Sequence, residues 1–152
     1  MRNALLCLLC GLALMSCRKY NVIYQKENAI PNDWSYDLPS AFEFSATDST
    51  KLYDVLLKVE HLNNFEYQNI YVKIATTFPT MNIVEDVVSL NISNDHGGWQ
   101  GKCENNLCET VLVLQEKTKL QQGKYTIKIF QHSRNERLKG VNKLTLEIRQ
   151  LK

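Results

Sequence analysis

Alternation of apolar and polar residues dominates the chain from residue 42 onward. In each run every second side chain is apolar, and the side chains between are mostly polar or charged. A period of two residues places the apolar side chains on one face of a β-strand. The runs that show this pattern cover residues 42–45, 55–60, 70–75, 125–130 and 144–149.

Three further segments differ from this pattern. Residues 111–114 form a continuous apolar run, which is typical of a strand covered on both faces. Residues 87–92 also favour a strand. Residues 115–121 are polar and are expected to form one helical turn or a loop, and no long helical stretch is visible.

Turn-forming residues separate the predicted strands and decide the fold class. Gly, Asn and Asp favour turns because they accept backbone conformations that other residues avoid. These features predict an all-β domain over residues 30–152, an antiparallel β-sandwich (Ig-like or jelly-roll) of about seven or eight strands. The turn segments are residues 48–49, 63–64, 95–98, 105–106 and 122–123.

The N-terminus has the layout of a bacterial lipoprotein signal. Arg2 precedes a 12-residue apolar stretch from Ala4 to Met15, which is too short to span a bilayer. The four residues from Leu14 to Cys17 match a lipobox, with Leu three positions before the cleavage site and Ser just before the cysteine. We therefore predict a signal peptide over residues 1–16, lipidation of Cys17 and a tether over residues 17–29. The alternative is an ordinary signal peptide.

Charge is close to balanced, which excludes one class of partner. The 152 residues hold 18 Lys and Arg against 16 Asp and Glu. A nucleic-acid-binding domain would show a strongly basic face or stripe. The length after removal of the leader suits one domain.

Two cysteines remain in the mature chain besides Cys17. Cys103 and Cys108 flank Asn105-Asn106, which is typical of a hairpin tip, and export permits disulfides. A structural disulfide is favoured over a metal pair, since two cysteines make half a zinc site, and over a redox motif, whose cysteines are two residues apart.

No catalytic constellation emerges from the polar residues, so we expect no enzyme and no cofactor. The histidines, His61, His96 and His132, lack metal-ligand spacing, and Asp95-His96 lacks a nucleophile in a recognisable elbow. Acidic residues are plentiful, but sequence cannot show a facing pair.

Three aromatic residues are the remaining candidates for binding. Trp34, Tyr36 and Trp99 can anchor a protein partner or stack on a sugar ring if they are exposed. The alternative is that Trp34 closes one end of the core and Trp99 covers a turn. Trp99 follows two glycines and is expected to be the more exposed of the two tryptophans.

As a whole the chain resembles the gliding-motility lipoprotein H (GldH) family of the Bacteroidetes. The order and spacing of several soft motifs carry the resemblance, and the Cys103/Cys108 pair departs from the family pattern. The motifs are the Cys17 lipobox, residues 30–35, 42–44, 69–72, 98–102 and 123–127, and a tail over residues 134–136 and 138–141.

The resemblance implies a lipid-anchored, non-enzymatic accessory protein of the gliding machinery, which is tied to type IX secretion. Its expected partners are the membrane, through acyl chains on Cys17, and other envelope lipoproteins or secretion components. Arg18 follows the lipidated cysteine where an inner-membrane retention signal would have Asp, and residues 18–20 lack the early acidic residues that mark surface export. Together these features favour the periplasmic face of the outer membrane. The alternative function is a lipid-anchored carbohydrate-binding module.

Overall fold

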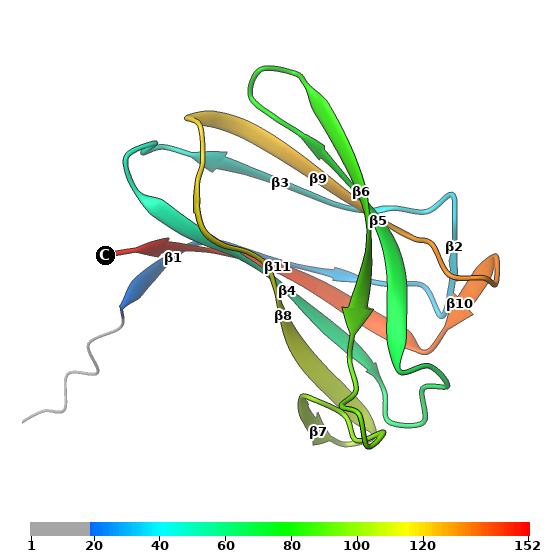
Figure 1. Cartoon of the computed structure of the whole chain (residues 1–152). Coiled ribbons are helices and arrows are strands. Elements are labelled where there is room, and N and C mark those ends of the chain that lie inside the picture. The colour runs from blue at the N-terminus through cyan, green and yellow to red at the C-terminus, as the bar shows by residue number, and fades with distance from the viewer. Residues whose placement is uncertain (1–18) are drawn as a thin grey trace, which may run out of the picture.

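The computed structural model describes residues 19–152, and these residues form two antiparallel β-sheets packed face to face (Figure 1). The predicted all-β sandwich is confirmed. Eight strands have seven or more residues, and three strands have three residues. In chain order they are β1 (Tyr20–Ala29), β2 (Asp33–Ser35), β3 (Ser40–Ala46), β4 (Leu52–Leu62), β5 (Asn69–Thr77), β6 (Ile83–Asn91), β7 (Lys102–Glu104), β8 (Leu107–Lys119), β9 (Gly123–Gln131), β10 (Arg137–Lys139) and β11 (Val141–Leu151).

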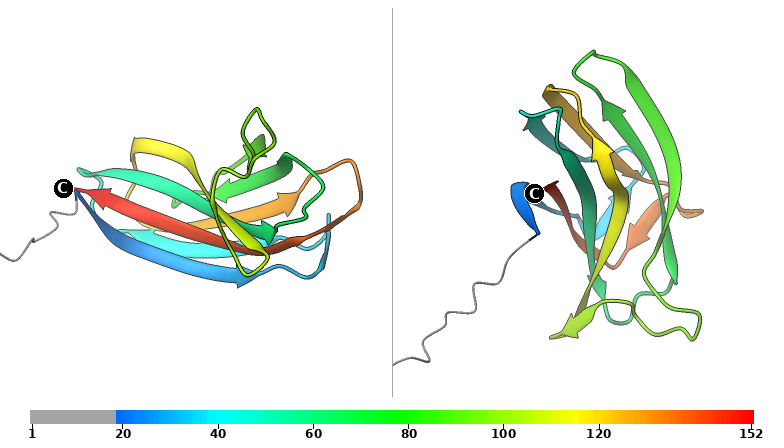
Figure 2. Two further views of the ribbon diagram at one scale, coloured as in Figure 1. Left: turned by 90° about the horizontal axis from the view of Figure 1, so that it is seen from below. Right: turned by 60° about the vertical axis from the view of Figure 1, so that its left-hand side comes forward.

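The larger sheet has five strands in the order β1-β11-β4-β8-β7, and the facing sheet has four in the order β3-β9-β5-β6. A two-stranded ribbon, β10-β2, lies at one end of the sandwich (Figures 1 and 2). Every pair of neighbouring strands is antiparallel. The domain therefore closes its core between two sheets without any helix among residues 19–152.

The alternation in the sequence becomes the two faces of each strand. In β3, Phe42 and Phe44 are buried while Glu43 faces solvent. Tyr125 on the neighbouring β9 stacks on Phe44 with ring centroids 5.0 Å apart. Side chains such as these point from one sheet into the space between the two sheets, and their burial is the main stabilising term.

The sandwich begins at Tyr20, ten residues before the expected domain start, and this corrects the tether assigned to residues 17–29. Residues 20–29 form β1, an edge strand that pairs with β11 along its whole length. Its alternation is weak because an edge strand is half solvated and because a register shift interrupts it between Val22 and Tyr24. Cys17 and the predicted signal peptide lie outside the described residues.

Two expectations for residues 111–121 are also wrong. Val111 and Val113 are 49% and 58% exposed, because the outer face of the larger sheet is open to solvent and only Leu112 and Leu114 face the core. The expected helical turn or loop is instead the end of β8, which continues to Lys119. Register shifts against β4 and a positive φ of 49° at Lys117 mark an irregular strand there.

The strand register places the chain's connections at two ends of the molecule. One end holds the pair formed by Tyr20 and Leu151, and we call it the anchor-side end because β1 begins there, after Cys17 (Figure 1). The strand order places three turns at the same end, over residues 47–51, 78–82 and 120–122. The opposite end, called the distal end, carries the connections over residues 30–39, 63–68, 92–101, 105–106 and 132–136.

A buried carboxylate joins two neighbouring strands, β11 and β4, on the outer face of the larger sheet. Glu147 is 3% exposed and accepts an ion pair from Lys58 Nζ at 2.7 Å and a hydrogen bond from Arg149 Nε. Burial alone would raise the pKa of Glu147, but the bonds from Lys58 and Arg149 outweigh it and hold the pKa below its ordinary value of 4.5.

The carboxylate of Glu147 should therefore make stability depend on pH in the acid range. Because its folded pKa is lowered, its contribution is fully present above pH 4.5 and is lost as pH falls through the folded pKa. We expect Glu147→Gln to reduce the free energy of unfolding by about 2 kcal/mol at pH 7 and by less at pH 3. Urea unfolding at several pH values measures this difference, and an equal loss at both pH values would contradict it.

Candidate functional site

The tip of the β7–β8 hairpin is closed by the predicted disulfide. Cys103 and Cys108 are directly opposite in the register, with Cα atoms 4.0 Å apart and an S–S bond of 2.00 Å. Between them Asn105 and Asn106 have φ values of 48° and 68°, the left-handed conformations of a two-residue hairpin turn. The sequence pattern therefore located both the hairpin and its cross-link.

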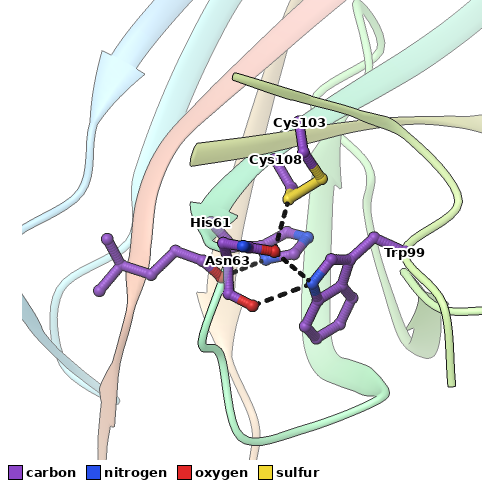
Figure 3. Close-up of a disulfide and its surroundings, with 6 residues drawn as sticks. His61, Asn63, Trp99, Cys103 and Cys108 are labelled. Carbon is purple, nitrogen blue, oxygen red and sulfur yellow. Dashed lines mark hydrogen bonds between the residues drawn. A yellow bond between two sulfur atoms is a disulfide. The ribbon is translucent and has the colours of Figure 1, made fainter. Parts of the chain in front are cut away.

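Trp99 lies near this disulfide, where it contacts Asn63, the residue that follows β4 (Figure 3). Its indole Nε1–H donates to both the backbone carbonyl and the side-chain Oδ1 of Asn63, at 3.0 Å each. The Sγ of Cys108 lies 3.5 Å from the same Oδ1. Asn63 thus links the tryptophan to the disulfide, and the indole is a fixed part of the distal end.

His61 is fully buried beneath Trp99. The two rings meet edge to face with centroids 4.6 Å apart, and Phe65 packs on the imidazole at 5.5 Å. Nδ1 lies 2.9 Å from the carbonyl oxygen of Leu62, while Nε2 has no hydrogen-bond partner. Burial lowers the pKa of His61, so the ring is neutral at pH 7 and acts as a packing group.

The two aromatic candidates of the 30–39 segment have different environments. Trp34 is 1% exposed, lies opposite Leu138 in the β2–β10 ribbon and donates from Nε1 to the carbonyl of Leu38 at 2.7 Å. It belongs to the core and offers no contact surface. Tyr36 is 37% exposed, and its hydroxyl donates to the carbonyl of Ser133 at 2.5 Å, which joins two distal loops.

A hollow of about 440 Å³ beside these loops was not found from the sequence. Its lining combines an aromatic wall, Phe65 and Tyr67, with the cationic side chains of Arg137 and Lys139. Tyr67 is 38% exposed and also lines a second hollow of about 320 Å³ with Tyr71 and three residues of the 132–136 loop. This half-exposed tyrosine therefore separates two depressions in the distal surface.

Buried Gln131 holds the loop that frames both hollows. Its Nε2 donates to the carbonyls of Asn135 and Glu136, at 3.2 and 2.7 Å, and its Oε1 accepts from Ser133 N at 2.9 Å. Asn135 then donates from Nδ2 to the hydroxyl of Tyr67 at 2.9 Å. Nothing in the local sequence pattern marks Tyr67 or Gln131, because loops that are far apart in the chain bring them together.

Comparison with known proteins decides the family. A family model described as GldH lipoprotein matches residues 22–148. The chain belongs to the GldH lipoprotein family. The resemblance carried by the sequence motifs is therefore confirmed.

Two curated relatives match over most of their length. The gliding motility lipoprotein GldH homolog of Christiangramia forsetii is 28% identical over 131 residues, which cover 85% of this chain and 80% of the relative. The gliding motility lipoprotein GldH of Flavobacterium johnsoniae is 26% identical over 156 residues, covering 98% of this chain and 97% of the relative. These names support a lipid-anchored envelope protein involved in gliding motility.

Solved structures give weaker likenesses. A carbohydrate-binding module, CBM28, specific for non-crystalline cellulose has a TM-score of 0.46 and 11% identity over 88% of this chain and 80% of its own. A family 35 carbohydrate binding module from Clostridium thermocellum has a TM-score of 0.38 and 13% identity over 84% and 90%. Likenesses of this size carry no inference about function.

In this GldH-family protein the distal end presents groups suited to a protein contact. Tyrosine and arginine are enriched at interface hot spots because they combine apolar area with directed hydrogen bonds. Tyr67 presents such a group at the rim of both hollows, and Arg137 lies in the larger one with Nη1 3.2 Å from Asp33 Oδ2. Within residues 19–152 no group of three or more His, Cys, Asp or Glu side chains is placed to hold a metal ion, and no helix is long and apolar enough to span a bilayer.

Loss of the disulfide should loosen this end of the GldH fold. The bond closes a loop of six residues, so the loop-closure estimate gives it about 2 kcal/mol of stability. We expect Cys103→Ser/Cys108→Ser to lower the free energy of unfolding by about that amount, as measured by denaturant unfolding of the oxidised protein. The same double variant should show no further loss when dithiothreitol is added, whereas the wild-type protein should. An unchanged wild-type midpoint under full reduction would contradict the prediction.

Proposed function

We propose that this protein is a non-enzymatic accessory component of the gliding-motility and type IX secretion machinery. Acyl chains on Cys17, palmitate among them, hold the sandwich at the periplasmic face of the outer membrane. The GldH lipoprotein match over residues 22–148 carries this proposal. Because a single acyl chain gives only marginal membrane binding, stable anchoring requires more than one chain.

The distal end is the surface that docks another envelope lipoprotein or a secretion component. It lies opposite the strand end that follows Cys17, so a partner reaches it without competing with the anchor. Tyr67 supplies an aromatic anchor next to two hollows, and Arg137 and Lys139 supply directed positive charge. A few such residues usually dominate the binding energy of an interface.

Replacement of the gene in the native host tests the anchor. A deletion strain complemented with Cys17→Ala should leave the protein in the soluble periplasmic fraction and should fail to restore gliding and secretion. Complementation with the wild-type gene is the control. Intact gliding and secretion in the deletion strain would reject the proposed role.

Crosslinking in native membranes tests the docking surface. Tyr67→Ala/Arg137→Ala should lose the crosslinked partner and gliding while keeping the membrane location, and Lys128→Ala, an exposed change on β9, should lose neither. Retention of every crosslink in the double variant would place the interface elsewhere.

A glycan array tests the alternative of a carbohydrate-binding module. Trp99 is the residue to test, because its indole is held by Asn63 and packs on His61 while part of it stays exposed. Glycan binding that is lost in Trp99→Ala would favour it over a protein partner.

A further inference from the structure

The anchor-side end lies close to any membrane that holds Cys17. The first strand begins at Tyr20, three positions after Cys17. A fully extended chain of that length spans at most about 11 Å. The tether therefore keeps the Tyr20 end of β1 near the bilayer surface, and the turn between β5 and β6, which lies on the facing sheet, reaches the bilayer when this end of the sandwich faces it. This step rests on the proposed lipidation of Cys17.

Large apolar side chains project from this end into solvent. Met81, in the turn between β5 and β6, is 78% exposed, and Ile83 and Val84 next to it are 64% and 47% exposed. Two backbone hydrogen bonds fix the turn, from Met81 N to Phe78 O and from Phe78 N to Asn82 O, both 2.9 Å. The turn therefore presents its apolar residues from a fixed backbone.

The turn over residues 47–51, the end of β8 and the residues that flank β1 and β11 add positive charge at this end. The exposed lysines are Lys19, Lys51, Lys119 and Lys152, and the one acidic side chain in the turns of this end, Asp48, is held by bonds from Thr50 N and Oγ1. The connections of the distal end carry five acidic side chains and one basic side chain, Arg134, while Arg137 and Lys139 lie in the adjoining β10. The acidic residues are Asp33, Asp37, Glu66, Asp95 and Glu136. Basic side chains next to a bilayer are attracted to anionic lipid headgroups.

We propose that the anchor-side end is a second membrane contact, in which Met81 and Ile83 enter the boundary between headgroups and acyl chains. The exposed lysines of this end meet anionic phospholipid headgroups. Apolar side chains beside basic ones are the combination by which peripheral proteins bind at a membrane interface. The contact holds the sandwich upright on the bilayer, with Tyr67 and the hollows directed away from it.

Fluorescence quenching in reconstituted vesicles tests this contact. The full lipoprotein is labelled with an environment-sensitive dye at Met81→Cys, or at Asp95→Cys on the distal end as the matched control. It is then reconstituted in vesicles of phosphatidylethanolamine and phosphatidylglycerol. Lipids that carry a shallow spin label should reduce the emission at position 81 about twofold and leave the emission at position 95 unchanged.

Two further results distinguish a failure of the second membrane contact from a failure of the lipid anchor. Lys51→Glu/Lys119→Glu should weaken the quenching at position 81 in vesicles with phosphatidylglycerol, but not in vesicles of neutral phosphatidylcholine. A protein that floats with the vesicles but shows no quenching at position 81 would overturn the second contact while leaving the anchor intact. A protein that does not float with the vesicles would overturn the lipid anchor, and this inference would fall with it.

Discussion

Replacement of Trp34 by alanine is expected to lower the free energy of unfolding by about 4 kcal/mol. The indole is 1% exposed and fills the space beneath the β2–β10 ribbon, so the substitution leaves a cavity that the short ribbon cannot close. The hydrogen bond from Nε1 to the carbonyl of Leu38 is lost as well. Urea unfolding followed by circular dichroism measures the change.

Tyr36 provides the matched control in the same segment. Its ring is 37% exposed and its hydroxyl makes one hydrogen bond, to Ser133 O, so Tyr36→Ala should reduce the free energy of unfolding by only about 1 kcal/mol. Equal losses for Trp34→Ala and Tyr36→Ala would show that Trp34 is not the packing centre of this end.

Replacement of Gly101 by alanine should displace the segment that carries Trp99. A Cβ atom at this position would lie 1.7 Å from the carbonyl oxygen of Glu109, a backbone atom of β8 that cannot rotate away. We expect a loss of about 3 kcal/mol in the free energy of unfolding. The tryptophan emission should also shift to longer wavelength as Trp99 moves away from His61.

Gly98 is a matched control on the other side of Trp99. A Cβ atom there would lie 3.1 Å from the side-chain Nδ2 of Asn94, a contact that a shift of a few tenths of an ångström relieves. Gly98→Ala should therefore change the unfolding free energy by less than about 1 kcal/mol. If both glycine variants behave alike, the close approach at Gly101 does not constrain the hairpin.

The strands that were predictable are those whose alternation is enforced by a core. Phe42, Phe44 and Tyr125 face the opposite sheet while their neighbours face water, so the sequence period and the structure agree. The disulfide was predictable because Cys103 and Cys108 lie at equal distances on either side of the turn formed by Asn105 and Asn106.

The elements that were missed are set by contacts between distant segments. β1 lacks clear alternation because one side of this edge strand is unpaired and its stability comes from pairing with β11 at the far end of the chain. Val111 and Val113 suggested a doubly covered strand, but no layer lies over that face in residues 19–152. The hollows around Tyr67 arise from loops that Gln131 and Asn135 hold together, which no local pattern encodes.

The pairing of β1 with β11 sets how this domain responds to tension. A pull on residue 19 along the strand axis loads the antiparallel ladder from Tyr20 to Ala29 in shear, so its hydrogen bonds resist together. A pull perpendicular to the strand would open the same bonds one at a time. The stacking of Arg149 on Tyr20, 4.4 Å from guanidinium carbon to ring centroid, adds a contact at the first point of load. The orientation of β1 thus gives the fold mechanical resistance to a force applied along its first strand.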